Sequence, residues 1–124
     1  MYTIGTFSTI SQIKRLNESN GRHFFSPSTM RYFNCRVHDV VYGGCVFVTS
    51  EKNDMPYRAP QPRIYTVRVA FDDASIHTYG SLGDYATRSD AHADARWLAA
   101  GLKAGTITYD TSKYDFVETT ILKD

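Results

Sequence analysis

The sequence lacks several features that mark common classes of protein. Its only two cysteines, Cys35 and Cys45, have no CxxC spacing, so we predict neither a zinc ribbon nor a secreted disulfide scaffold. No apolar run approaches the ~20 residues of a membrane-spanning helix. The N-terminus has no basic stretch followed by an apolar one, as a signal peptide would. We therefore expect a cytoplasmic protein with both thiols reduced and no membrane partner.

Catalytic motifs are also missing. There is no glycine-rich phosphate loop, no GxSxG and no HExxH. The four histidines have no HxH or HxxxH spacing, so any metal site would have to be assembled by the fold. One of them, His92, stands near Asp94 and Arg96, and we expect it to be solvated. The sequence predicts no enzyme, no metal and no cofactor.

Cys35, His38 and Asp39 nominally supply a nucleophile, a base and an orienting acid. On a strand, however, Cys35 and His38 point to opposite faces. Cys35 also continues an apolar alternation with Phe33 and Val37. We interpret it as a buried structural cysteine.

The composition favours one sheet-rich domain over residues 1–124. A chain of this length suits a domain of common size, and it can bury a core without a metal or a disulfide. Aromatic residues make up 14 % of the chain, with nine Tyr and seven Phe. These residues favour strands, because aromatic side chains pack well on a pleated surface.

Two helices are predicted from apolar spacing and from their end signals. The first runs from Ser8 or Thr9 to Asn20, with an apolar residue at every third or fourth position. The second runs over 89–104, with Ser89 as its N-cap and Gly105 as its terminator. Ser26 followed by Pro27 predicts one short helical turn between them.

The strands predict an α+β fold. We expect an antiparallel sheet of 3–5 strands packed against two helices, in the order α-β-β-β-β-α with a β tail. Residues 51–62 hold three of the four prolines and should form a surface loop. The expected strands are residues 33–38, 45–50, 63–71 and 76–79, with tail strands over 106–110 and 116–122.

The longest strand should present two different faces. Tyr65, Val67, Val69 and Phe71 alternate and are assigned to the core. The opposite side is more polar, and if the polar sides of neighbouring strands coincide they form a basic face suited to phosphate and unstacked bases. A solvated outer sheet face would give the same pattern, and we prefer this simpler interpretation. The candidate binding residues on this face are Arg36, His38, Arg68, His77 and Tyr79.

Charge is unevenly distributed along the chain. Residues 1–68 contain nine Lys/Arg and four Asp/Glu, whereas residues 69–124 contain five and nine. Such an asymmetry is typical of a basic binding face. The simpler interpretation, which we prefer, is that the two halves pair electrostatically within one fold.

The order helix, three strands, helix over about residues 8–104 resembles the double-stranded RNA-binding domain. In that family the start of the last helix is rich in lysines that bind phosphates. Here Asp90 and Asp94 stand in the corresponding stretch, and their carboxylates would repel phosphate.

Several blocks resemble a family of small uncharacterised proteins from bacteriophages, plasmids and actinobacterial genomes. They are the HFF and TMRYF blocks of residues 23–33, VYGG and FVTSE within residues 41–51, YTVR at 65–68 and the weaker YATR at 85–88. The resemblance implies an origin on mobile elements. It implies no reaction.

We therefore expect a non-enzymatic accessory protein of a phage or mobile element that binds a host macromolecule, above all a host protein. Tyr and Arg are plentiful, as they are at interface hot spots. The alternative is a weak nucleic-acid-binding module that uses the basic sheet face. An enzyme built on Cys35 or on a histidine ranks lowest.

Overall fold

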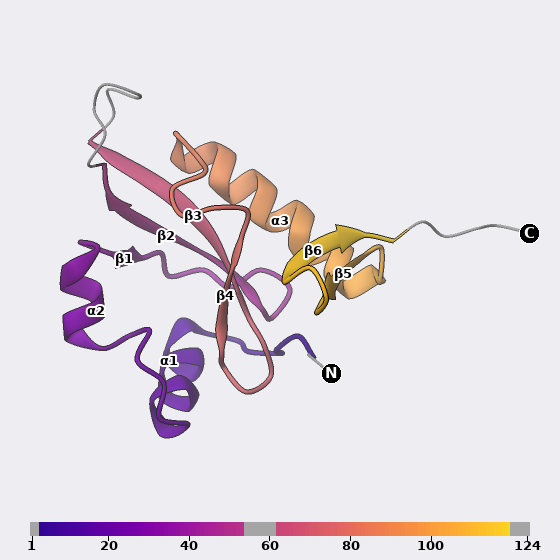
Figure 1. Cartoon of the computed structure of the whole chain (residues 1–124), viewed down its shortest axis with the longest axis horizontal. Coiled ribbons are helices and arrows are strands. Elements are labelled where there is room, and N and C mark those ends of the chain that lie inside the picture. The colour runs from indigo at the N-terminus through magenta and orange to yellow at the C-terminus, as the bar shows by residue number, and fades with distance from the viewer. Residues whose placement is uncertain (1–2, 54–61, 120–124) are drawn as a thin grey trace, which may run out of the picture.

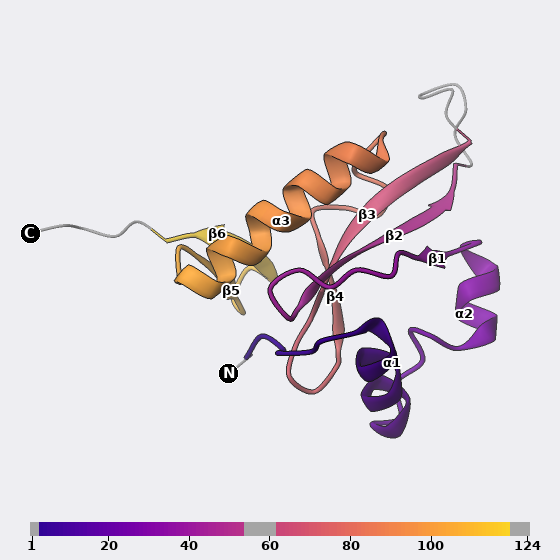
Figure 2. The ribbon, with the colours of Figure 1, turned by 180° about the vertical axis from the view of Figure 1, so that it is seen from behind.

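The computed structural model describes residues 3–53 and 62–119. A central antiparallel sheet has one long helix on one side and two shorter helices on the other (Figure 1). Figure 2, seen from behind, shows the same separation. The predicted α+β class is therefore confirmed.

The chain forms the two short helices first, then the four strands of the sheet, then the long helix and last a separate hairpin. The helices are α1 (Ile10–Ser19), α2 (Pro27–Tyr32) and α3 (Arg88–Ala104). The sheet has the order β1-β2-β3-β4, and β5 and β6 form a separate hairpin. The strands are β1 (Arg36–Val37), β2 (Val46–Lys52), β3 (Arg63–Ala70), β4 (Ile76–Tyr79), β5 (Ile107–Asp110) and β6 (Asp115–Glu118).

Side-chain oxygens cap the start of each helix. Thr9 accepts a hydrogen bond from the backbone of Gln12, and Ser26 does the same at α2, as the sequence predicts. The prediction for α3 is wrong by two residues, because Thr87, and not Ser89, is the N-cap. Both residues have a hydroxyl, and only the backbone geometry decides which one caps. Gly105 ends α3 with φ +80°, as expected.

The first two strands differ from their predicted bounds. The segment predicted as a strand from residue 33 pairs only at Arg36–Val37. Phe33 instead caps the end of α2, and Asn34 has φ +44°, a left-handed conformation that a strand does not contain. Strand β2 continues through Glu51 and Lys52. The expected proline loop therefore starts later, and its residues 54–61 lie outside the described residues.

The two later strands form the predicted tail. Strand β5 pairs with β6 in an antiparallel register from Ile107 opposite Glu118 to Asp110 opposite Asp115. The expected continuation of the last strand to residue 122 lies outside the described residues beyond 119.

Helix α3 covers the face of the sheet that the sequence assigns to the core. It has 17 residues, and one side of it is buried against β2 and β3. In the part of the chain that the structure describes, none of the helices combines the length and the apolar character needed to span a bilayer. The sheet residues in this core include Val46, Val48, Val67, Val69 and Phe71, and the helix contributes Ala91, Ala95, Leu98 and Leu102.

The opposite face of the sheet is also covered. Phe47 and Ala70 form a second core with Ile13 of α1 and Phe25, which precedes α2. Thr66, on this side of β3, is completely buried. The expectation of a solvated outer face is therefore wrong, because α1 and α2 pack where the strand pattern alone suggested water.

Candidate functional site

A cavity of about 260 Å³ opens beside α2, on the side of the sheet that α1 and α2 cover. Most of its wall is apolar, and among the described residues that line it Arg68 of β3 has the only charged side chain. We call this cavity the α2 pocket. It is lined by Phe24, Thr29, Met30, Phe33, Cys35, Arg68 and Leu82.

Arg68 is held in place from several directions. Its Nε donates to Thr49 Oγ1 at 3.1 Å, and its Nη1 donates to Thr78 Oγ1 at 2.6 Å. The guanidinium carbon lies 5.2 Å from the ring centre of Phe24, which is a cation–π distance. Nη2 lies 3.8 Å from Glu51 Oε2, and the Arg68 side chain is only 11 % exposed. A fixed cation therefore forms part of an otherwise apolar pocket.

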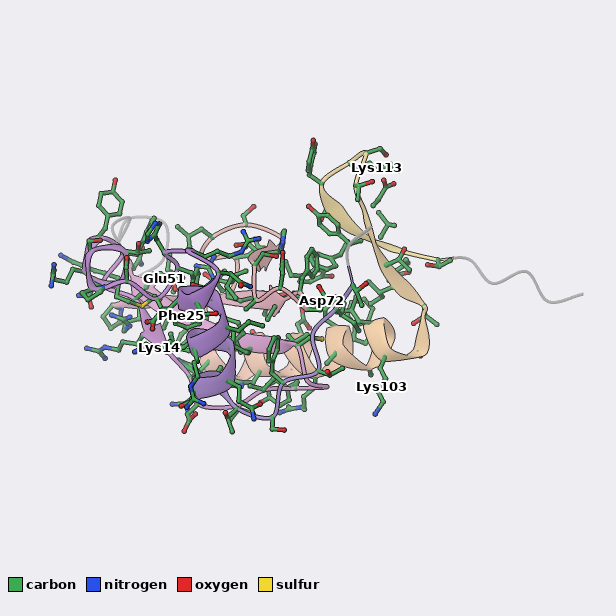
Figure 3. All side chains as sticks on the ribbon, turned by 90° about the horizontal axis from the view of Figure 1, so that it is seen from below. Lys14, Phe25, Glu51, Asp72, Lys103 and Lys113 are labelled. Atoms are coloured by element: carbon green, nitrogen blue, oxygen red, sulfur yellow. The ribbon has the colours of Figure 1, made fainter. Side chains whose placement is uncertain are left out.

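Glu51 supplies the counter-charge from β2. The residue is 2 % exposed, and a buried carboxylate needs partners to be tolerated. The Thr66 hydroxyl donates to Oε1, and the Cys35 Sγ lies 3.7 Å from Oε2. Thr66 in turn accepts from the backbone of Gly83 at 2.9 Å. Figure 3 labels Glu51, which lies near the Lys52 end of β2.

The thiols do not have the properties of catalytic nucleophiles. Burial and the nearby Glu51 raise the pKa of Cys35 to about 11, and burial raises that of Cys45 to about 11. The thiolate is the reactive form, and such pKa values keep it scarce at neutral pH. His38 contacts His92 instead of Cys35, so the fold does not bring the nominal Cys35 and His38 pair together.

The five residues predicted for a basic sheet face do not share one face. Arg68 lines the α2 pocket, whereas His38 contacts α3 on the other side of the sheet. His77 and Tyr79 also lie on the α3 side. Arg36 is exposed on β1. The geometry expected for this face is therefore wrong, because alternate residues of β3 point to opposite sides and Arg68 points away from the others.

His77 and Tyr79 are packed among aromatic rings. The His77 ring stacks on Phe71 at a centroid distance of 3.9 Å and lies 5.4 Å from Tyr109. The Tyr79 ring lies 6.0 Å from that of Phe116 on β6. Burial lowers the pKa of His77, and the nearby Asp73 partly opposes this effect. These two residues therefore contribute mainly to packing between the sheet and the β5–β6 hairpin.

A hydrogen-bonded chain that the sequence did not predict joins the segment after β1 to α3. His38 Nδ1 lies 2.8 Å from His92 Nε2, and His92 Nδ1 lies 2.7 Å from the Tyr42 hydroxyl oxygen. The two imidazole rings are nearly parallel, with centroids 5.1 Å apart. We call Tyr42, His92 and His38 the histidine chain. The expectation of a solvated His92 is wrong, since both of its ring nitrogens have partners.

The surroundings of the histidine chain are electropositive. Burial is the main cause that lowers the pKa of His38 to about 4, followed by the charges of Arg88, His92 and Arg63. Burial, Arg88 and Arg96 lower the pKa of His92. Within residues 3–53 and 62–119, no group of three or more His, Cys, Asp or Glu side chains could hold a metal ion. Because the pKa values of His38 and His92 are both lowered, the two imidazoles of the histidine chain are neutral at neutral pH.

Most of the chain matches one known protein family. A model described as a family of unknown function, DUF7447, matches residues 9–96. The chain belongs to the DUF7447 family. This DUF7447 segment runs from the N-cap of α1 into α3, so it contains the α2 pocket and the histidine chain but not the β5–β6 hairpin. No curated protein and no solved structure matches the chain.

Proposed function

We propose that this protein is a non-enzymatic accessory protein that binds a partner protein through the α2 pocket. The observation that carries the proposal is the exposed apolar surface at this pocket. Phe33 and Leu82 line the pocket and are nevertheless 39 % and 47 % exposed. Tyr32 packs edge-to-face on Phe33 at 4.8 Å and is 83 % exposed. Exposed apolar groups gathered around a pocket are typical of interaction sites.

The size of the pocket favours a side chain over a free ligand. Its volume of about 260 Å³ is below the ~300–1,000 Å³ of sites that enclose a whole small molecule. An aliphatic or aromatic anchor of a partner suits the walls formed by Phe24 and Met30. Arg68 can donate to a carbonyl oxygen of the same partner, while Glu51 balances its charge.

The resemblance of the sequence blocks adds a biological setting to this proposal. It suggests a protein of a bacteriophage or other mobile element, with a host protein in the bacterial cytoplasm as the partner. The raised pKa of Cys35 supports the non-enzymatic part of the proposal, because it argues against the most obvious nucleophile.

The test compares variants that differ only at the surface. The wild type, Leu82→Asp, Phe33→Asp and the control Tyr114→Asp are used as baits in the native host. Tyr114 is also an exposed aromatic residue, but it lies in the β5–β6 turn beside Lys113, at the opposite end of the molecule from α1 (Figure 3). A partner that uses the pocket is retained by the wild type and by Tyr114→Asp and is lost in both pocket variants. Circular dichroism checks that each bait is folded.

Binding of that partner is then measured with purified components. Leu82→Asp and Phe33→Asp each place a charge in the apolar contact with the partner. Loss of a hot-spot contact costs about 2 kcal/mol or more, so we expect binding to weaken at least about tenfold. Equal binding by Leu82→Asp and Tyr114→Asp would reject the pocket as the interface.

A further inference from the structure

Helix α3 carries one row of basic side chains beside the histidine chain. Arg88, His92 and Arg96 are four residues apart, so they lie along one side of the helix. Asp90 and Asp94 are two residues away from members of this row, which corresponds to about 200° around the helix. The Asp94 carboxylate accepts a hydrogen bond from the Tyr85 hydroxyl at 2.9 Å, away from the row. The carboxylates of α3 therefore do not face the histidine chain.

Two arginines of the sheet extend this basic region. Arg63 is fixed at the end of β3, where its Nη2 donates to the carbonyl oxygens of Asn34 and Ser50 at 2.6 Å each. Burial is the main cause that lowers the pKa of Arg63, the charge of Arg36 adds to it, and Glu51 opposes it. The Arg88 side chain, by contrast, is exposed and has no hydrogen-bond or ion-pair partner among the described residues. The region thus combines a fixed cation, Arg63, with a cation that is available to a ligand, Arg88.

The Nε2 atom of His38, at the end of the histidine chain, is also available to a ligand. His38 uses Nδ1 for His92, and its Nε2 has no hydrogen-bond partner within residues 3–53 and 62–119. The groups that affect the pKa of His38 or His92 are Arg63 of β3, Arg88 and Arg96 of α3, and the other imidazole. No carboxylate of the described residues is among them. An anion at this position would meet donors and positive charge without a competing acid.

We propose that Arg88, His38 and Arg96 form a binding site for the oxyanion of a phosphate ester. Guanidinium groups recognise phosphate through paired charge-assisted hydrogen bonds, and a neutral imidazole adds one N–H donor. The site lies on the α3 side of the sheet, so it is separate from the α2 pocket. It also differs from the basic face expected from the sequence, because Arg68 and His77 have no part in it.

The affinity of this site for phosphate should change with pH in one direction, which follows from the pKa of His38. A bound phosphate places negative charge beside His38 and therefore raises the pKa of its imidazole. By linkage, a ligand that raises a pKa binds more tightly as the pH falls toward the pKa of the bound state. The affinity for a phosphate diester, whose charge is constant in this range, should therefore increase as the pH is lowered from about 6.5 toward 4. The imidazole of His92 and the guanidinium groups of Arg63 and Arg88 act on His38, Arg96 acts on His92, and these positive charges limit the size of the increase.

The first experiment uses inorganic phosphate and the ring ¹⁵N signals of the histidines. At constant ionic strength, we expect saturable shifts for His38 and His92 and none for His77, which is stacked on Phe71. Arg88→Gln should weaken phosphate binding about tenfold, as expected for the loss of a charge-assisted hydrogen bond. The control is Lys103→Gln, which removes the same charge from the last turn of α3 and should change nothing (Figure 3).

A second experiment distinguishes the two sources of a phosphate ester. Fluorescence anisotropy is measured with labelled single-stranded RNA and duplex DNA over a salt series. Tighter binding than with phosphate, and a log–log salt slope that Arg88→Gln reduces by about one unit, assign the site to a nucleic-acid backbone. Phosphate binding without oligonucleotide binding assigns it to a small phosphorylated molecule.

Both of those results support the oxyanion site. The proposal is overturned if phosphate shifts neither His38 nor His92 and oligonucleotide binding is insensitive to Arg88→Gln. It is also overturned if Lys103→Gln weakens binding as much as Arg88→Gln, because the effect would then come from net charge. Arg88 is exposed, so the variant should remain folded, and thermal unfolding verifies this.

Discussion

Glu51 of β2 and Arg68 of β3 form an ion pair, with 3.8 Å between Oε2 and Nη2, and their side chains are 3 % and 11 % exposed. Each of the two charges would be costly to bury alone. The pair lies under the α1 and α2 layer, so it links the stability of the sheet to the α2 pocket. Removal of one partner should therefore affect both.

We expect Glu51→Gln to lower the free energy of unfolding by about 3–5 kcal/mol, because it leaves the buried Arg68 charge without a counter-charge. Urea denaturation measures the loss. The double variant Glu51→Gln/Arg68→Met should lose less than the sum of the two single variants. Additive losses would show that the two charges do not depend on each other.

Thr66→Val should destabilise the protein by about 1–3 kcal/mol, although the two side chains are similar in shape. The substitution removes the hydroxyl that donates to Glu51 and accepts from Gly83. The control is Thr108→Val, on the exposed side of β5, which should change the free energy of unfolding by less than ~0.5 kcal/mol. If the two substitutions cost the same, the buried hydroxyl has no structural role.

Thr87→Ala should cost about 1 kcal/mol of stability, because the Thr87 side chain caps α3 by accepting from the backbone of Asp90 at 3.2 Å. Ser89→Ala should have a much smaller effect, since Ser89 lies inside the first turn. Thermal unfolding of both variants tests the observed helix start. A larger loss at Ser89 would restore the start that the sequence predicts.

Stability should fall as the pH decreases from about 6.5 to about 4. The pKa of His38 is about 4 in the folded protein and 6.5 in the reference state, so between these values the unfolded chain binds more protons. His92 contributes in the same direction. Hydrogen bonds from Ser75 hold the pKa of Asp73 below 3.8, so its contribution is lost at still lower pH.

Denaturant midpoints measured across this pH range test that expectation. His38→Gln should have a shallower dependence on pH between 6.5 and 4, because its side chain does not titrate. An unchanged slope in this variant would mean that other groups cause the loss of stability.

The sequence predicted the features that depend on local pattern. The alternation of Tyr65, Val67, Val69 and Phe71 identified one buried sheet face, and polar caps located α1 and α2. Local pattern does not reveal which layer covers the other face. The burial of Thr66 depends on helices more than thirty residues earlier in the chain, so a polar strand face was interpreted as solvated.

The candidate sites depend even more on long-range contacts. His38 and His92 are 54 residues apart in sequence, and no spacing rule joins them. Glu51 and Arg68 pair diagonally across β2 and β3, and their pairing requires the register. One signal was available in the sequence: the four-residue spacing of Arg88, His92 and Arg96, which separates this row from Asp90 and Asp94 once the segment is assigned to a helix.

The histidine chain has a direction. If the Tyr42 hydroxyl donates to His92 Nδ1, then His92 Nε2 donates to His38 Nδ1, and the proton of neutral His38 is on Nε2. If Tyr42 accepts, every donor and acceptor is reversed, and His38 Nε2 presents a lone pair. The two rings therefore change tautomer together, so a group that touches only His38 also determines which way the hydroxyl hydrogen of Tyr42 points.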